Sequence, residues 1–304
     1  ALVNVIDSRI FATTSSPTLA EGLTFQPGVR VENDCQNCGF TQARINGLDG
    51  HYSQVLIDSR PVFSALAGVY GLEQIPSSMI DRVEVVRGGG SALFGASAIG
   101  GTINIITKEA MSSSAGISHD LTSIGVSGAL DNNTGLNASM VTDDGRGGLF
   151  VFGQRRSRDG YDADGDGFTD IPMINSITVG TRGHLRVNPF SKIRLEYHGT
   201  KEFRRGGDRL DLPAHETLVA EQTEHTNNSG SLSYDGQSQD GRQIWNAYAS
   251  AQHIRRSSYY GTGKDPNAYG KTTDLTAVFG GQYSYKFDCL LFMPAQLTAG
   301  LEYN

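Results

Sequence analysis

An acidic segment near the middle of the chain has the residue pattern best suited to binding a metal ion. Asp162, Asp164 and Asp166 alternate with small residues, and the glycines among them allow a tight turn. Carboxylate oxygens at this spacing suit Ca²⁺, and Asp170 is a fourth candidate ligand. The segment is not an EF-hand, because Met173 stands where an EF-hand has a bidentate glutamate. A calcium site and a solvated acidic loop both remain open.

Other reactive residue types do not form a catalytic pattern. The chain has no G-x-S-x-G motif and no plausible grouping of serine, histidine and aspartate, so we expect no enzymatic activity. Its histidines are scattered, and a lone histidine is usually structural or solvated. Arg204, Arg205 and Arg209 are close in sequence and could attract an anionic ligand, although a solvated basic loop is the commoner explanation.

Composition narrows the class of protein only in part. The chain has 304 residues, 38 of them glycine, and a formal net charge of −7, which argues against a nucleic-acid-binding surface. It contains no apolar run of about 18 residues, the length that a transmembrane helix needs. Its many small and polar residues suit a soluble all-β domain. They also suit a transmembrane β-barrel, whose strands turn only every second residue to lipid.

The stretch from Ile80 to Lys108 organises the N-terminal part of the chain. Residues 82–86 and 103–107 alternate β-branched with polar residues, which predicts two strands joined by a glycine-rich loop. A tight loop in any α/β or α+β domain would explain this pattern. A phosphate-binding loop, and with it an enzyme, is disfavoured because no G-K-[ST] follows the glycines.

This stretch, I-D-R-V-E-V-V-R-G…S-A-L-F-G-A-S-A-I-G-G-T-I-N-I-I-T-K, resembles the plug domain of TonB-dependent outer-membrane receptors. Two earlier segments resemble it as well: T-L-A-E-G-L…Q-P-G-V, which predicts a helix over residues 15–26, and V-L-I-D-S-R-P-V at residues 55–62, in which Ser59 replaces a common glycine. The resemblance implies an α+β plug domain over residues 1–110.

Site residues follow from the same resemblance. In the family, the segment after residue 62 forms an apical loop that faces the ligand, so we expect ligand contacts from His51, Tyr52, Arg60, Phe63 and Tyr70. Packing of a helix-like turn explains the segment equally well. Charges enclosed in a barrel must be paired. The candidates for ion pairs between plug and barrel are Arg82, Glu84 and Arg87.

The two cysteines of the motif Cys35-Gln36-Asn37-Cys38 have no second pair and no nearby histidine, so a zinc site is unfavoured. The sequence after them is not a helix start, which argues against a thioredoxin-like redox pair. In the oxidising envelope compartment that the resemblance implies, we predict a disulfide between Cys35 and Cys38, with free thiols as the alternative.

Residues 115–304 predict a series of β-hairpins. Apolar and polar residues alternate in several segments, as in Ile193-Arg194-Leu195-Glu196-Tyr197, and the connections alternate between short turns and long polar loops. This is the pattern of an outer-membrane barrel with short periplasmic turns and long external loops. The family barrel closes with 22 strands. About nine are expected here, so residues 115–304 resemble the N-terminal portion of a transmembrane antiparallel β-barrel.

The resemblance implies an outer-membrane transporter or receptor for a metal chelate, a ferric siderophore or haem, with a cobalamin receptor of the same family as the alternative. The expected partners are a TonB-type energy-coupling complex, the chelate and outer-membrane lipid, with a surface lipoprotein as a further candidate and no nucleic acid. No cofactor is required, and calcium at residues 162–170 is the candidate ion, because some cobalamin receptors of this family order their loops with calcium. An alternative from another class is a structural or adhesion outer-membrane β-protein without transport.

Overall fold

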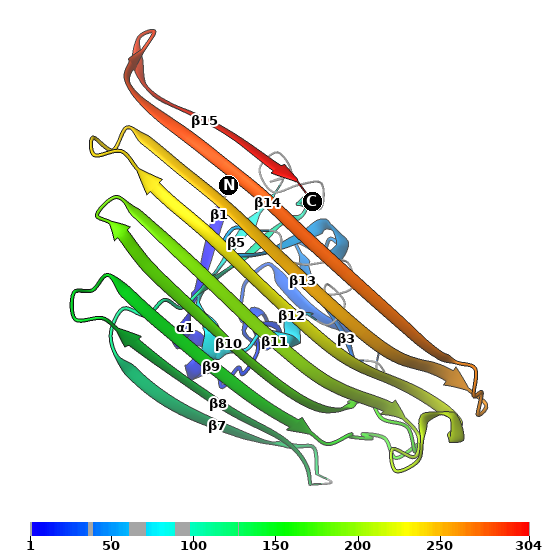
Figure 1. The fold of residues 1–304 in the computed structure, drawn as a ribbon. Coiled ribbons are helices and arrows are strands. Elements are labelled where there is room, and N and C mark those ends of the chain that lie inside the picture. Colours follow the sequence, from blue (N-terminus) through cyan, green and yellow to red (C-terminus); the bar gives the residue numbers. More distant parts are fainter. Residues whose placement is uncertain (1, 36–38, 61–70, 89–97, 127, 304) are drawn as a thin grey trace.

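The computed structural model describes residues 2–35, 39–60, 71–88, 98–126 and 128–303 (Figure 1). Two parts are evident: an N-terminal α+β domain, called the plug here (residues 2–110), and a large curved sheet, called the wall (Ser114–Tyr303). Among the described residues, no helix combines the length and apolar character needed to cross a membrane.

The plug is built from short elements. In chain order these are β1 (Leu2–Asp7), α1 (Ser8–Thr13), α2 (Leu19–Leu23), β2 (Val29–Cys35), β3 (Phe40–Ile45), η1 (Gly50–Tyr52), β4 (Ser53–Ile57), η2 (Ser77–Met79), β5 (Ile80–Arg87) and β6 (Gly101–Thr107).

The two strands predicted around the glycine-rich loop are β5 and β6, and they lie at the centre of a four-stranded sheet of order β1-β5-β6-β4. β5 and β6 pair antiparallel, whereas β4 pairs parallel with β6. The start of β6 requires glycine, because a side chain at Gly101 would place a Cβ 2.4 Å from the carbonyl oxygen of Val86. The inward residues Val83, Val85, Ile103 and Ile105 are fully buried and form the plug core.

The helices differ from the prediction. The helix expected over residues 15–26 is only α2 (Leu19–Leu23), and α1 was not predicted. α1 begins where it does because the Asp7 carboxylate caps it, accepting hydrogen bonds from the backbone N–H of Arg9 at 2.9 Å and Ile10 at 3.2 Å.

The wall consists of nine strands, each antiparallel to the next in sequence, which confirms the expected fold class and strand number. They are β7 (Ser114–Ile124), β8 (Ala129–Val141), β9 (Gly147–Arg158), β10 (Met173–Asn188), β11 (Ser191–Gly207), β12 (Val219–Gln237), β13 (Gln243–Thr262), β14 (Tyr269–Leu290) and β15 (Met293–Tyr303). The short η3 (Ala214–Glu216) lies between β11 and β12.

The connections of the wall differ at its two ends. Residues 142–146, 189–190, 238–242 and 291–292 form short turns at one end, whereas residues 159–172, 208–218 and 263–268 form longer loops at the other (Figure 1). The long loops that the sequence predicts at residues 203–217 and 260–272 are shorter in the structure, because β11 continues to Gly207 and β13 to Thr262.

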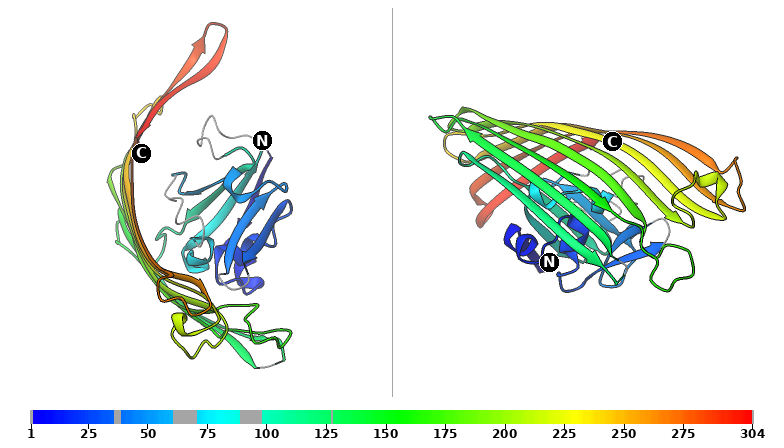
Figure 2. Two further views of the ribbon diagram at one scale, coloured as in Figure 1. Left: turned by 90° about the vertical axis from the view of Figure 1, so that its right-hand side faces the viewer. Right: turned by 90° about the horizontal axis from the view of Figure 1, so that it is seen from below.

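The wall is largely polar on its buried concave face and largely apolar on its exposed face, which is the reverse of the arrangement in a soluble protein. The plug lies within the concave face (Figure 2), and the wall residues buried there are largely polar, among them Gln154, Thr178, Thr200, Asn227 and Gln252. The exposed wall residues are largely apolar, among them Leu136, Val179, Leu195, Leu232, Leu275 and Leu301. This arrangement suits strands whose outer face meets lipid.

Candidate functional site at the plug–wall interface

Arg182 on β10 joins the middle of the wall to the plug. Its Nη1 donates to Asp58 Oδ2 and to the Thr107 carbonyl oxygen, each at 3.0 Å. Its Nε lies 3.2 Å from Glu196 on the neighbouring strand β11. Only 7% of either the Arg182 or the Asp58 side chain is exposed, so each charge depends on the other for compensation.

The turn after β4 places Asp58 for this contact. Asp58 and Ser59 have φ angles of +49° and +65°, a left-handed conformation that favours glycine. The side chain of Asn104 on β6 holds the turn, because its Oδ1 accepts a hydrogen bond from the Ser59 N–H at 2.8 Å. Thr107 secures Asp58 by donating its N–H at 3.2 Å and its hydroxyl at 2.7 Å to the carboxylate.

Arg204 near the long-loop end of β11 contacts two segments of the plug. Its Nη2 lies 2.6 Å from Glu73, and its Nη1 donates to the Gly39 carbonyl oxygen at 2.5 Å. Burial alone would raise the pKa of Glu73, but Arg204, with Arg158 and Arg156 nearby, holds that pKa below its ordinary value. The buried guanidinium therefore pairs with an ionised carboxylate.

Gln74, next to Glu73, extends this contact along the wall. Its amide Nε2 lies 3.4 Å from Glu202 Oε1 on β11 and 3.2 Å from His225 Nδ1 on β12. These side chains are all buried, so the plug segment at residues 73–74 is fixed to two adjacent wall strands.

Arg156 on β9 contacts α2, the second helix of the plug. Its Nη2 lies 2.8 Å from Glu21 on α2 and 2.6 Å from Asp131 on β8. Burial raises the pKa of Glu21, and Arg156 offsets this only in part. Two residues earlier on β9, Gln154 donates from Nε2 to the Pro17 carbonyl oxygen at 2.9 Å.

Glu109, where the plug passes into the wall, pairs with Lys192 at the start of β11. His184 on β10 lies 3.4 Å from the same carboxylate. Burial alone would raise the pKa of Glu109, but Lys192, His184 and Arg182 bring it below the ordinary value.

The ion pairs between plug and wall share one polarity. In each pair described here that involves an arginine or lysine, the plug supplies the carboxylate and the wall supplies the cation. The pairs are Glu21–Arg156, Asp58–Arg182, Glu73–Arg204 and Glu109–Lys192.

The three residues that the sequence analysis expected to pair with the wall contact other residues of the plug instead. Arg82 is paired with Glu84 at 2.8 Å and with Asp81 at 3.1 Å, all on the plug. Glu84 also accepts a hydrogen bond from Asn104 Nδ2 at 3.2 Å. Arg87 packs over Gly28, again within the plug. In the described part of the chain, none of these three side chains forms an ion pair with the wall.

The expected ligand contacts are not brought together at one described surface. His51 and Tyr52 are exposed on η1, where His51 Nδ1 lies 2.6 Å from Asp49. Arg60 is buried against the wall: its guanidinium lies 5.0 Å from the centre of the Tyr248 ring, and its Nη1 lies 3.4 Å from Ser231 Oγ. Phe63 and Tyr70 lie outside the described residues.

Cys35, at the end of β2, is disulfide-bonded. Its expected partner Cys38 lies outside the described residues. The exposed Cys289 is a free thiol.

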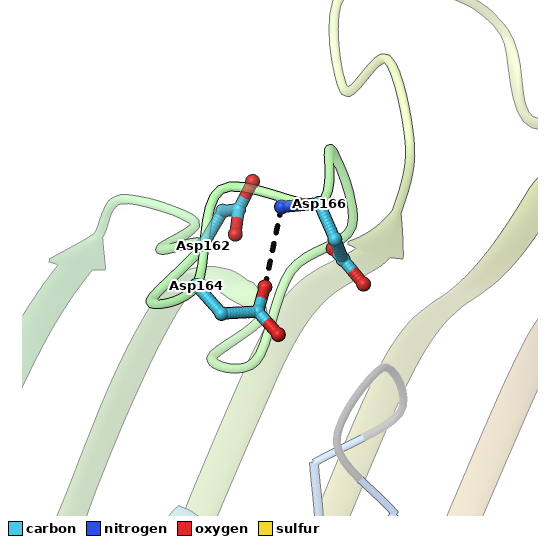
Figure 3. Close-up of side chains that lie close together, drawn as sticks. All are labelled: Asp162, Asp164 and Asp166. Carbon is cyan, nitrogen blue, oxygen red and sulfur yellow. Dashed lines mark hydrogen bonds between the residues drawn. The ribbon is translucent and has the colours of Figure 1, made fainter.

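The acidic segment forms a closed turn in the loop between β9 and β10 (Figure 3). Carboxylate oxygens of Asp162, Asp164 and Asp166 lie within 4.8 Å of one another. Backbone N–H groups of Gly167 and Gly165 donate to Asp162 and keep its pKa low. Both glycines have positive φ angles, +91° and +79°, which the turn needs. Asp170 lies outside the three-carboxylate group and accepts a hydrogen bond from the Ala163 N–H at 2.8 Å.

Sequence reasoning did not single out Asp58, Glu73, Glu109, Arg182 or Lys192 as site residues, and it considered Arg204 only as a group that could attract an anionic ligand. The alternation along β10 and β11 placed Arg182 and Glu196 on the polar face of their strands, which is where they lie. Pairing them with plug residues required the three-dimensional arrangement, since Arg182 and Asp58 are 124 positions apart.

Comparisons with known proteins agree with this architecture. Residues 1–102 match the family model of the TonB-dependent receptor plug domain. The vitamin B12 transporter BtuB of Vibrio cholerae is 34% identical over 106 residues, covering 35% of this chain and 17% of BtuB. BtuB of Photobacterium profundum is 27% identical over 198 residues, covering 62% of this chain and 31% of the relative. The chain thus spans less than a third of these curated relatives.

Solved structures show the same fold. The siderophore receptor PirA of Acinetobacter baumannii superimposes with a TM-score of 0.83 at 18% identity, over 99% of this chain and 47% of PirA. The ferric enterobactin receptor PfeA of Pseudomonas aeruginosa, in complex with enterobactin, gives a TM-score of 0.77 at 18% identity, over 99% of this chain and 49% of PfeA. Residues 1–102 thus form a plug domain of the TonB-dependent receptor family, and the chain as a whole has the fold of the plug and a nine-stranded part of the barrel of these receptors.

Proposed function

We propose that this chain is part of an outer-membrane active transporter for a metal chelate. The observation that carries the proposal is a plug domain held by buried ion pairs against the polar face of a sheet whose other face is apolar. Such a plug blocks passage at rest and must rearrange for cargo to pass. The mechanism is a ligand-biased order–disorder change in the plug, without covalent chemistry.

The proposed cargo is a ferric siderophore or haem, with cobalamin as the alternative. Relatives named as vitamin B12 transporters and structural neighbours named as siderophore receptors support the metal-chelate class. The family model matches the plug, and the structural likeness, at 18% identity, reflects the fold alone. Both comparisons therefore fit a ferric siderophore or haem as well as cobalamin.

The proposed partners follow from the same architecture. A TonB-type energy-coupling complex would act on the plug from the periplasm, and outer-membrane lipid would cover the apolar face of the wall. His51, Tyr52, Arg60, Phe63 and Tyr70 remain proposed ligand contacts, and a surface lipoprotein is a further proposed partner.

Growth of a deletion strain on single sources of iron, haem and cobalamin tests the transport proposal. We expect the strain to lose growth on one source and to regain it with the wild-type gene, provided that the energy-coupling complex is intact. Unchanged growth and unchanged chelate uptake on every source would favour a structural or adhesion role instead.

We also propose calcium binding at Asp162, Asp164 and Asp166, with Asp170 supporting the turn. The convergence of three carboxylates and the low pKa of Asp162 favour it, because an ionised oxygen cluster suits Ca²⁺. Calorimetric titration of the intact receptor with Ca²⁺ should show binding that Asp164→Asn weakens. Asp143→Asn, in a turn at the opposite end of the wall, is the matched control. Absence of heat on titrating the wild-type receptor would remove the proposal.

A further inference from the structure

The plug contains two β-turns with the same backbone conformation, residues 45–48 and residues 57–60. An isolated β-bridge joins the first and last residue of each turn. The two central residues have φ angles of +52° and +80° in the first turn and of +49° and +65° in the second. Positive φ angles at both central positions are those of a type I′ turn. The two turns therefore require the same left-handed conformation from their central residues.

The sequences of the two turns suit this conformation to different degrees. The first turn has Asn46-Gly47, the pair that type I′ turns favour, because asparagine tolerates a left-handed conformation and glycine has no Cβ. The second turn has Asp58-Ser59, so a serine stands where the first turn has glycine. A left-handed conformation is unfavourable for a residue with a Cβ. The turn of residues 57–60 is therefore the strained one of the two.

The wall holds the strained turn through two of its residues. Asp58 pairs with Arg182 on β10, as described above. The Arg60 guanidinium lies 5.0 Å from the centre of the Tyr248 ring on β13. In the described part of the chain, no hydrogen bond or ion pair joins residues 45–48 to the wall. The strain therefore lies in the turn that contacts the wall, where surrounding contacts can maintain it.

Tyr248 is positioned by the two strands that follow β13. Its cross-strand partner on β14 is Gly280, and a side chain there would place a Cβ 2.4 Å from the Tyr248 ring. The ring therefore lies across β14, and its hydroxyl donates to Glu302 on β15. A guanidinium over a tyrosine ring is attracted to the negative charge of the ring face. Strands β13 to β15 together thus fix the ring that holds Arg60.

An adjoining cavity gives the strained turn room to move. The cavity has a volume of about 540 Å³, lies at the short-turn end of the wall and has Asp58 and Ser59 in its lining. Ile57, which precedes them, is buried in the plug core. The two central residues can therefore change conformation into the cavity while the core stays in place.

We propose that residues 57–60 form a strained latch between plug and wall. While the plug is docked, Arg182 and Tyr248 hold Asp58 and Arg60, and the turn keeps its left-handed conformation. When these contacts break, the turn relaxes into the cavity. The relief of strain at Ser59 favours this released state, so the plug leaves the wall more easily than with an unstrained turn. This inference rests on the proposed transport function and identifies residues that set its conformational step.

Hydrogen exchange and uptake test the latch in the intact receptor. Ser59→Gly removes the strain and keeps the side chains of Asp58 and Arg60. The backbone N–H groups of Ile57 and Arg60 each donate to the other residue's carbonyl oxygen at 3.0 Å, and we expect both to exchange about fivefold more slowly in this variant. The maximal uptake rate should fall by a similar factor. The concentration for half-maximal surface binding should not change.

Two further substitutions separate the latch from a turn that is merely strained. Tyr248→Leu removes the ring that holds Arg60, so exchange at residues 57–60 should become about fivefold faster. Tyr248→Phe keeps the ring and should restore exchange to near the wild-type rate. Asn46→Gly is the matched control, because it replaces a left-handed residue in the turn without wall contacts. Its uptake and its exchange at residues 57–60 should equal those of the wild type.

The uptake probes are ferric enterobactin, haem and cyanocobalamin, each supplied alone to cells that carry the receptor in place of the deleted gene. Wild-type uptake by Ser59→Gly, or an equal loss of uptake in Asn46→Gly, would overturn the latch and leave the transport function standing. Unchanged exchange at residues 57–60 in Tyr248→Leu would overturn it as well. Absence of energy-dependent uptake of every probe by the wild type would instead overturn the transport function itself.

Discussion

The Glu73 carboxylate lies 2.6 Å from the Arg204 guanidinium and joins the plug to the wall across 131 positions of sequence. Only 1% of the Arg204 side chain is exposed. Arg204 also binds the Gly39 carbonyl oxygen, so one wall residue holds two separate plug segments. Displacement of either segment would leave a buried charge without its full set of partners.

Replacement of Arg204 should therefore loosen the plug. Arg204→Met leaves Glu73 and Glu202 in a buried site without their cation, and we expect local opening of residues 71–75 to become easier by about 3–5 kcal/mol. Hydrogen exchange of this segment in the intact receptor measures the effect. The double variant Arg204→Met/Glu73→Gln should recover most of the loss, and equal exchange in the single and double variants would contradict the account.

Acidification should weaken the same contact. The folded pKa of Glu73 is below its ordinary value of 4.5, so its stabilising contribution is present above about pH 4.5 and is lost as pH falls through the lowered value. Glu109 has the same direction of shift and adds to the effect. A spin-label distance between plug and wall, followed from pH 7 to pH 3, should lengthen or broaden at the acid end.

Glu73→Gln is the control for this titration, because its amide does not ionise. Its plug–wall distance should already be broadened at pH 7 and should change less on acidification. A wild-type distance that is constant down to pH 3 would exclude a docking role for these carboxylates.

A charge on the outer face of the wall should impair assembly. Val179 is exposed near the middle of β10, so Val179→Arg would place a cation in lipid at a cost of about 2–4 kcal/mol. Leu218→Arg is the matched control, because Leu218 is similarly exposed but lies in a loop beyond the strands. The folded fraction in lipid vesicles, measured by heat-modifiable gel mobility, should fall for Val179→Arg alone. Equal yields would argue against a lipid-facing surface at Val179.

Local patterns in the sequence predicted much of the fold. The alternation around the glycine-rich loop identified β5 and β6, and alternation after residue 115 predicted the nine wall strands. Helix α1 was not predicted from the sequence, because it is only six residues long and depends on the Asp7 cap more than on apolar periodicity. The parallel pairing of β4 with β6 was not predicted either, because it joins segments that are separated in sequence by β5 and the glycine-rich loop.

The site was less predictable than the fold. Alternation assigns Arg182 to the polar face of its strand but does not say which plug carboxylate lies opposite it. Arg82 and Glu84 were equally plausible from sequence, yet they pair with each other along β5. The ion pairs across the interface depend on the position of the plug relative to the wall. The local sequence pattern of a single strand does not determine that position.

Cross-linking the plug to the wall tests the central claim most directly. Gln74 and His225 contact at 3.2 Å across the interface, so Gln74→Cys/His225→Cys in a Cys289→Ser background allows a short reducible cross-link. The account predicts that the cross-linked receptor still binds its chelate but does not take it up. Reduction should restore uptake, while the uncross-linked parent shows the effect of the reductant alone. Uptake at the parent's rate through the cross-linked receptor would contradict the claim that the plug must leave this wall for cargo to pass.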